Sequence, residues 1–534
     1  MRAKPNVDSV TDIYRSIVSP SEVERLIEQA AQSEMRNTPH RVFDVSNGML
    51  CSRGTQMILA FKSSPEYRDL VSSISSPDQL TRESQRISAV VSKFFQFVVL
   101  SHRWQKYELA FHDAQGLSII SLPANEGTSK LQNLCRTAAA LGYRWAWSDT
   151  CCINKQSSAE LQEAITSMFS WYRHAALTIV YLSDVAASAG PGSLKESEWH
   201  RRGWTLQEFL ASRNILFYSR NWTLYRNIQS LNHKQVPSIL DELEVATSIK
   251  KESISAFSPG LKNAREKLRW ASHRTTTVEE DVAYSLFGIF DLQLSVFYGE
   301  KKEKALGRLL QEIVARSGDV LVLEWTGKSS LFNSCLPDDI SSFKNSPLIS
   351  PSSAENAMQP SVAELTEKVN REDAIRLYNQ LRELGPPRFS NSRLLLPSII
   401  HPVQAIKEVQ YDGSLYSYSI ASVGLNDICF TSSEKLLNPR NRSNKSRRQK
   451  FILAQIWNRE LLDQTGDQES EHRDGNDMSA MRLVSCLARP FFALLLVEDR
   501  HGEYKRVASD GEILPHTVDL TKLLSPTIKT LEIL

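Results

Sequence analysis

The chain has no long hydrophobic run, although it has 534 residues. Its longest apolar stretch is the segment FFALLLV at 491–497, whereas a membrane-spanning helix needs about 20 apolar residues. The N-terminal residues 1–16 also lack the apolar core of a secretory signal peptide. We therefore expect a protein that neither spans a membrane nor enters the secretory pathway, and we predict a cytoplasmic location.

Cysteine and net charge are also scarce. The chain has seven cysteines, and an odd, thinly spread set is typical of reduced thiols rather than of a disulfide framework. The adjacent pair Cys151-Cys152 lacks the spacing of ordinary metal ligands, so we expect no metal. The formal net charge is +2, whereas a general nucleic-acid-binding protein is usually more basic. These counts indicate an ordinary globular protein.

The pattern of apolar residues divides the chain into four parts, since a chain of this length is too long for one core. We predict a helical N-terminal extension over 1–90, an α/β domain over 91–230, a helical segment over 231–318 that packs on that domain, and a mostly β C-terminal domain over 319–534. Within the last part, the polar stretches 346–361 and 463–479 have the composition of mobile loops.

Strand and helix patterns alternate within the α/β part. Four short apolar runs have the length of buried strands: FQFVVL (95–100), YRWAWS (143–148), LTIVYL (177–182) and NILFYS (214–219). Amphipathic helical patterns cover 129–142 and 159–175 between them, and RGWTLQEFL (202–210) precedes the last run. Such alternation predicts a parallel sheet flanked by helices, in which ligands bind at the carboxyl ends of the strands.

Polar, reactive or aromatic side chains follow the predicted strands. They are Ser101, His102, Arg103 and Trp104 after the first strand, Asp149, Cys151 and Cys152 after the second, Ser183 and Asp184 after the third, and then Trp199, Arg202, Trp204 and Glu208. In a parallel sheet these groups gather at one edge. An acid, a cation, hydroxyls and aromatic walls are the usual content of a small-molecule site.

Each of these residues also has a purely structural interpretation. Asp149 fits a turn cap as well as it fits a binding role, and His102 fits a buried histidine with satisfied hydrogen bonds. Cys151 beside His102 fits a nucleophile, although vicinal cysteines in an apolar turn are usually inert. Spacing alone favours Glu208 as an ordinary helix charge and the tryptophans as core residues.

Four segments of this part, in order, resemble the fungal heterokaryon incompatibility (HET) domain. They are VVLSHRW (98–104), LGYRWAWSDTCCINK (141–155), SMFSWYRHAALTIVYLSDV (167–185) and WHRRGWTLQEFLA (199–211). The segment 270–313 is similar to the region that follows this domain in HET proteins of mushroom-forming fungi (basidiomycetes). The resemblance implies a cytoplasmic fungal protein of non-self recognition, innate immunity and programmed cell death. It also implies action by assembly, as a homo-oligomer or with other incompatibility proteins.

HET domains are considered distant relatives of toll/interleukin-1 receptor (TIR) domains, so the resemblance implies a TIR-like parallel sheet. Some TIR domains hydrolyse NAD with one glutamate in a helix soon after a strand and a tryptophan, and Trp204 and Glu208 match that arrangement. Carried over residue by residue, Glu208 is the catalytic carboxylate. Ser101, His102, Arg103, Asp149 and Trp204 then lie near the dinucleotide. NAD is the substrate of this alternative, and no bound cofactor is implied.

The chemistry of such a site is straightforward. Cleavage of the nicotinamide–ribose bond passes through an oxocarbenium-like state, which a nearby carboxylate such as Glu208 stabilises electrostatically. A wall formed by Trp204 would exclude water, and Arg103 would pair with pyrophosphate. The sequence therefore leaves two functions open, which are assembly with partners and NAD hydrolysis.

A third interpretation is nucleic-acid binding through NPRNRSNKSRRQK (438–450), in which six of thirteen residues are Lys or Arg. A basic run without interleaved aromatic residues is more often a solvated loop, so we do not expect a nucleic-acid partner. We find no nucleoside-triphosphate-binding loop and no internal repeat. The trigger of the protein, its oligomeric state and the role of its β-rich half are not readable from the sequence.

Overall fold

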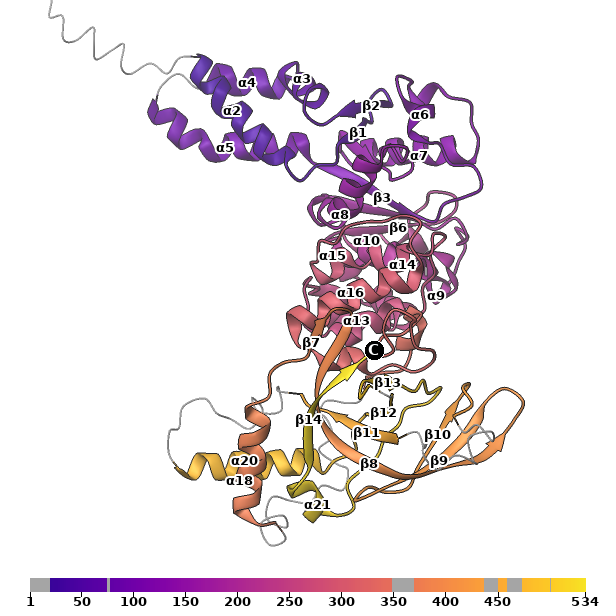
Figure 1. The fold of residues 1–534 in the computed structure, drawn as a ribbon. Coiled ribbons are helices and arrows are strands. Elements are labelled where there is room, and N and C mark those ends of the chain that lie inside the picture. The colour runs from indigo at the N-terminus through magenta and orange to yellow at the C-terminus, as the bar shows by residue number, and fades with distance from the viewer. Residues whose placement is uncertain (1–19, 74–76, 348–368, 437–449, 459–472, 500) are drawn as a thin grey trace, which may run out of the picture. The chain divides into compact units, whose positions relative to one another are not determined.

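The computed structural model describes residues 20–73, 77–347, 369–436, 450–458, 473–499 and 501–534 (Figure 1). The chain divides into two compact units, Met1–Pro259 and Gly260–Leu534, so the boundary falls inside the predicted helical segment 231–318. Among the described helices, none combines the length and the apolar character that crossing a bilayer requires. The basic run up to residue 449 and most of the predicted loop 346–361 lie outside the described residues.

Within the described part of the first unit, a six-stranded sheet has the order β2-β1-β4-β3-β5-β6. The strands are β1 (Arg41–Asp44), β2 (Met49–Ser52), β3 (Phe97–His102), β4 (Trp145–Trp147), β5 (Leu177–Tyr181) and β6 (Ile215–Tyr218). Neighbouring strands from β4 to β6 run parallel, and Val99 of β3 pairs with Trp147 and Thr178 on its two sides. The alternation of strands and helices and the flanked sheet are therefore confirmed.

The N-terminal region is not wholly helical. It contains α2 (Pro20–Met35), α3 (Gln56–Lys62), α4 (Pro65–Ser73) and α5 (Pro77–Phe95), as the sequence predicts, but β1 and β2 form a hairpin between α2 and α3. β1 pairs antiparallel with β4, so the hairpin extends the sheet and makes it mixed. Each of these strands has only four residues, which is too short for a convincing alternation of apolar side chains.

Helices α7 (Glu126–Ala140) and α8 (Ser158–His174) form where the apolar spacing predicts them. Asn125 and Ser157 cap their first turns by accepting hydrogen bonds from the backbone N–H groups of Thr128 and Glu160. Their apolar faces pack with those of α2 and α5 against the sheet, and the core contains the fully buried Trp145 and Trp147. This packing fixes the carboxyl ends of β3, β4 and β5.

Short elements complete the first unit. They are α6 (Phe111–Ala114), η1 (Ile119–Ser121), α9 (Ser193–Glu196), η2 (Glu198–Arg201), α10 (Thr205–Ala211), η3 (Tyr225–Asn227), η4 (His233–Gln235), α11 (Pro237–Thr247) and α12 (Lys251–Ser255). All seven residues of α10 are buried. At the C-terminal end of this helix, Lys234 donates hydrogen bonds to the carbonyls of Phe209 (2.6 Å) and Ser212 (2.8 Å). A buried lysine thus satisfies the carbonyl groups that a helix end leaves unpaired.

The second unit begins with helices and continues into a β region. The helical elements are α13 (Ala264–Ala271), α14 (Asp281–Tyr284), α15 (Phe287–Phe290), α16 (Lys302–Ser317), η5 (Val320–Leu323), η6 (Ile340–Phe343), α18 (Arg371–Arg382), α20 (Arg473–Leu487) and α21 (Leu520–Leu524). Two predictions fail here. The domain predicted as mostly β from residue 319 begins with the 3₁₀ turn η5 and not with a strand, and residues 473–479 of the predicted loop begin α20.

The described strands of the second unit form a sheet whose path closes on itself. They are β7 (Arg388–Ser390), β8 (Arg393–Tyr411), β9 (Tyr416–Ser422), β10 (Ile428–Ser432), β11 (Lys450–Ile456), β12 (Ala493–Glu498), β13 (Tyr504–Arg506) and β14 (Thr527–Ile533). The order is β10-β9-β8-β11-β12-β13-β14, and β14 also pairs with β8. The prediction of a β-rich C-terminal region is confirmed.

Candidate functional site

The ends of β3 and β4 and the helix α10 bring polar side chains together in the first unit. Ser101 and His102 are the last two residues of β3, Asp149 follows β4, and Glu208 lies in the middle of α10. Parallel pairing of β3 with β4 and β5 places their carboxyl ends at one edge of the sheet. Residues far apart in the chain therefore meet there.

Glu208 is a buried carboxylate with fixed partners. Its side chain accepts a hydrogen bond from the Ser101 hydroxyl, and that hydroxyl accepts one from the Trp199 indole at 2.8 Å. Burial raises the pKa of Glu208 to about 7, and the charge of Asp149 adds to the rise. Hydrogen bonds from Ser101 and Tyr172 and the charge of Arg202 act in the opposite direction. Glu208 is thus able to change its protonation state near neutral pH.

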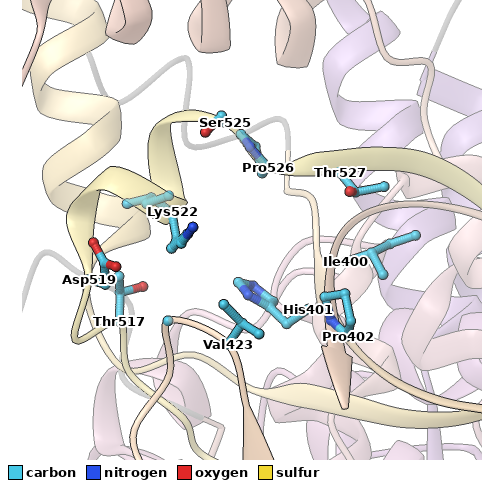
Figure 2. Close-up of a pocket in the computed structure, with 12 residues that line it drawn as sticks. Ile400, His401, Pro402, Val423, Thr517, Asp519, Lys522, Ser525, Pro526 and Thr527 are labelled. Carbon is cyan, nitrogen blue, oxygen red and sulfur yellow. The ribbon is translucent and has the colours of Figure 1, made fainter. Parts of the chain in front are cut away.

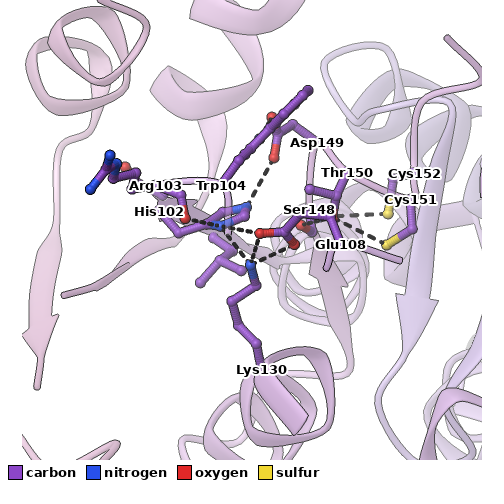
Figure 3. A network of polar contacts seen from close by, with 12 residues as sticks. His102, Arg103, Trp104, Glu108, Lys130, Ser148, Asp149, Thr150, Cys151 and Cys152 are labelled. Atoms are coloured by element: carbon purple, nitrogen blue, oxygen red, sulfur yellow. Dashed lines mark hydrogen bonds and ion pairs between the residues drawn. The ribbon is translucent and has the colours of Figure 1, made fainter. Parts of the chain in front are cut away.

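Asp149 is the second carboxylate of the site and has the opposite electrostatic character. His102 Nε2 lies 3.1 Å from its Oδ1, and the Trp104 indole donates a 2.8 Å hydrogen bond to its Oδ2 (Figure 3). Burial alone would raise the pKa of Asp149, but the hydrogen bond with His102 and the charges of Lys155 and Arg202 hold it well below its usual range. Asp149 is therefore ionised at neutral pH.

His102 connects Asp149 to a buried ion pair. Lys130 Nζ lies 2.9 Å from His102 Nδ1 and donates a 2.6 Å hydrogen bond to Glu108 Oε2. Burial lowers the pKa of His102, and the positive charge of Lys130 lowers it further. A neutral imidazole that accepts a hydrogen bond from the Lys130 ammonium at Nδ1 carries its proton on Nε2 and donates a hydrogen bond from there to Asp149. The chain of contacts fixes both the ring and the carboxylate.

Trp104 forms the part of the site that reaches solvent. Its side chain is 40% exposed, whereas Glu208 is 4% exposed. The ammonium of Lys155 lies 3.5 Å from the centre of the Trp104 ring, and the guanidinium of Arg202 lies 4.8 Å from it. The exposed edge of the site therefore combines two cations, an aromatic face and an ionised aspartate. This combination suits a ligand that has both charged groups and an aromatic ring.

The predicted site residues divide into those that meet and those that do not. Ser101 contacts Glu208, and His102 contacts Asp149. Trp204 is half-buried and packs against the core of the unit. Arg103 points away from the network in Figure 3, and its guanidinium is 3.9 Å from Glu198 with the side chain 55% exposed. Arg202 takes the place beside the two carboxylates where we expected Arg103.

Cys151 does not have the surroundings of a nucleophile. It is fully buried, and its sulfur lies 3.8 Å from the Thr150 hydroxyl. Burial raises the pKa of the adjacent Cys152 thiol well above its usual value. Buried thiols in apolar surroundings remain protonated and inert, which favours the structural interpretation of this pair.

Sequence reasoning missed Glu108, Lys130 and Tyr172. Lys130 left a signal, because it stands four and eight positions before Leu134 and Ala138 on the buried face of α7. A lysine on an apolar face needs a buried partner, and Glu108 supplies it. Glu108 and Tyr172 left no signal, since a single polar residue in a loop and a tyrosine on an apolar helix face are both common. Among the described residues, no three His, Cys, Asp or Glu side chains are grouped to hold a metal ion.

Two comparisons place this region among known proteins. Residues 97–194 match the sequence profile of the family described as heterokaryon incompatibility protein (HET). The chain is also 38% identical over 228 residues to the vegetative incompatibility protein HET-E-1 of Podospora anserina. That similarity covers 41% of this chain and 16% of HET-E-1, so the chain spans less than a fifth of the length of this relative. No solved structure matches the chain significantly. The family match at residues 97–194 includes Ser101, His102 and Asp149 and ends before Glu208.

Proposed function

The chain contains a fungal heterokaryon incompatibility (HET) domain, and we propose that it acts in non-self recognition between fungal individuals that ends in regulated cell death. The observation that carries this proposal is the match of residues 97–194 to the HET family, together with the similarity to a protein named for vegetative incompatibility. The polar network at the ends of β3 and β4 lies within the matched residues or in contact with them. It is the working part of the domain in this proposal.

The first mechanism is assembly. In this mechanism the domain acts through contacts with further copies of the chain or with other incompatibility proteins. Inducible expression of the full chain in a filamentous fungus tests the function, because growth arrest of the induced cells is expected. The variant Asp149→Ala should remove the arrest, whereas Asp69→Asn, a change of an exposed aspartate in α4, should leave it intact. Growth arrest by both variants would show that the polar network around Asp149 is not needed for the function.

The second mechanism is hydrolysis of NAD by a TIR-like site, and a specific observation favours it. Two neighbouring carboxylates have environments that drive their pKa values apart, since Asp149 is held ionised and Glu208 has a pKa of about 7. Such pairs are typical of sites that use one carboxylate as a charge and the other as an acid or base. Arg202 and Lys155 would face the pyrophosphate, and Trp104 would face the nicotinamide or adenine ring.

The burial of Glu208 sets a condition on this mechanism. Glu208 is only 4% exposed and the Ser101 hydroxyl occupies a hydrogen-bonding position of its carboxylate, so a ribose carbon reaches it only after this contact opens. We infer that assembly supplies this opening, which joins the two mechanisms in one sequence. Purified chain should then release nicotinamide from NAD only under conditions that promote self-association. Killing that proceeds without any loss of cellular NAD would leave assembly as the whole mechanism.

A further inference from the structure

A pocket in the second unit lies among β8, the turn after β9 and the segment around α21 (Figure 2). Its volume is about 170 Å³. An apolar cavity of about 150 Å³ is able to hold benzene, so this space suits a molecule of that size. The strand β8 contributes Ile400, His401 and Pro402, and the opposite wall consists of residues near α21.

The walls of the pocket are held by backbone contacts rather than by long side chains. Thr527, the first residue of β14, pairs with Ile400 of β8, and Val518 N donates a 2.9 Å hydrogen bond to the carbonyl of Gly424. Gly424 has a φ of +78°, and a β-carbon there would lie 3.0 Å from Cβ of Lys522. A glycine is therefore needed both for the turn and for the close approach of the Lys522 stem.

One buried hydroxyl of the pocket lacks a partner, and one exposed lysine beside it forms no ion pair among the described residues. The Thr517 hydroxyl is buried and makes no hydrogen bond within the described residues. Lys522 forms no ion pair there either, and its side chain extends toward the pocket in Figure 2. A buried hydroxyl without a partner is uncommon, because it loses water without compensation. A ligand that accepts hydrogen bonds would satisfy both groups.

His401 faces Lys522 across the pocket in Figure 2 and is only 8% exposed. Its Nε2 lies 3.3 Å from Oε1 of Gln455, and its ring stacks on Phe491 with the centres 5.5 Å apart. A glutamine oxygen accepts, so Nε2 carries the proton and the ring is held in one orientation. The remaining wall is mostly apolar: Ile400, Pro402, Val423, Leu523 and Pro526 contribute to it, with Ser525 and Thr527 beside them.

We propose that this pocket binds a small amphipathic carboxylic acid, with its carboxylate on Lys522 and Thr517 and its apolar body against β8. The single cation matches one negative charge, and the apolar wall matches a hydrocarbon body of about benzene size. Asp519 also lines the pocket beside Lys522 and opposes an anion, which limits the affinity. The proposal is independent of the function of the HET domain and gives the β-rich half a role in sensing a metabolite.

Benzoate is the probe for this proposal, with benzamide as its neutral counterpart. Calorimetric titration of the full chain should show saturable binding of benzoate below about 10 mM, and weaker binding of benzamide. Lys522→Met should weaken benzoate binding about tenfold or more and leave benzamide unchanged, and Thr517→Val should weaken it severalfold. Asp519→Asn should strengthen it. Lys529→Met, a change of an exposed lysine on β14 outside the pocket, is the matched control.

A labelling experiment on the unaltered chain guards against misfolded variants. Benzoate should protect Lys522, and not Lys529, from acetylation by acetic anhydride, as read by mass spectrometry. Absence of saturable binding, equal binding of benzoate and benzamide, or full binding by Lys522→Met with no protection of Lys522 would each overturn the proposal.

Discussion

The hydroxyl of Ser101 donates a hydrogen bond to the carboxylate of Glu208, although the two residues stand 107 positions apart in the chain. Ser101 lies at the end of the central strand β3, and Glu208 lies in α10, which the chain reaches only after two more strands of the sheet. The contact links a hydroxyl inside the HET-matched residues to a carboxylate beyond them. It makes the folded domain, rather than a local motif, the unit that positions Glu208.

The raised pKa of Glu208 predicts a dependence of stability on pH. Its pKa is about 7 in the fold and near 4.5 when unfolded, so the stabilising protonated form is lost as pH rises through about 7. Glu208→Gln imitates the protonated form and should make the chain more stable than wild type at pH 8, by up to roughly 3 kcal/mol, and nearly equal to it at pH 4.5. Thermal unfolding at both pH values measures the difference.

The control for this prediction is Glu196→Gln, which changes an exposed glutamate of α9. Its unfolding temperature should follow wild type at both pH values. A Glu208→Gln variant that is less stable than wild type at pH 8 would mean that the Glu208 carboxylate is ionised and well compensated in the fold.

The lowered pKa of Asp149 predicts the opposite behaviour. An aspartate whose folded pKa is depressed contributes stability above its unfolded pKa and loses it as pH falls through the folded value. Asp149→Asn should therefore cost about 1–3 kcal/mol at pH 7, since it weakens hydrogen bonds from His102 and Trp104 to a charged oxygen. The cost should shrink toward pH 3. Chemical denaturation from pH 3 to 7 measures it, and a cost that stays constant would contradict the assigned charge.

Lys234 is expected to hold α10 in place. Replacement by Met removes the donors that satisfy the carbonyls of Phe209 and Ser212, and leaving buried carbonyls unpaired costs about 1–3 kcal/mol. Hydrogen exchange should speed up in α10 more than in β3 or β5. The exposed Lys195→Met is the control. Unchanged exchange in α10 would show that packing alone fixes the helix that carries Glu208.

Cys151 is expected to be dispensable. Iodoacetamide should modify the exposed Cys429 in the native chain and leave the buried Cys151 and Cys152 unmodified. Cys151→Ala should keep the cell-killing activity and lose about 1 kcal/mol of stability from the small cavity. Peptide mass spectrometry and the growth assay check both statements. A loss of killing in a stably folded Cys151→Ala variant would restore the nucleophile interpretation.

The sequence predicts the parallel part of the first sheet because its strands are short, apolar and separated by amphipathic helices. β3 is buried over all six residues, so periodicity and length both indicate it. The hairpin β1–β2 is not predicted by this pattern, because strands of four residues are too short to show a clear alternation. Val42 and Phe43 become core residues only because β1 pairs with β4. The 3₁₀ turn η5 shows the reverse case, in which an apolar run is buried without forming a strand.

The site was predictable to the extent that strand ends converge. Ser101, His102, Asp149 and Glu208 all follow from that rule. The rule did not predict that Arg202, and not Arg103, lies beside the two carboxylates, because that depends on the direction of the loop after β3. The guanidinium of Arg103 lies near Glu198 instead. Glu108 was missed because it lies in a loop with no local signature, although its partner Lys130 stands on the apolar face of α7 and indicated a buried partner.

The most direct test compares Glu208→Gln with wild type and with Glu196→Gln at matched expression in a filamentous fungus, with growth arrest scored and cellular NAD measured in the same cultures. Thermal unfolding of each purified chain at neutral pH confirms that all three are folded. The proposal that Glu208 is the working carboxylate predicts that wild type and the Glu196→Gln variant arrest growth and that the Glu208→Gln variant does not. Arrest by a folded Glu208→Gln variant at the wild-type level would contradict it.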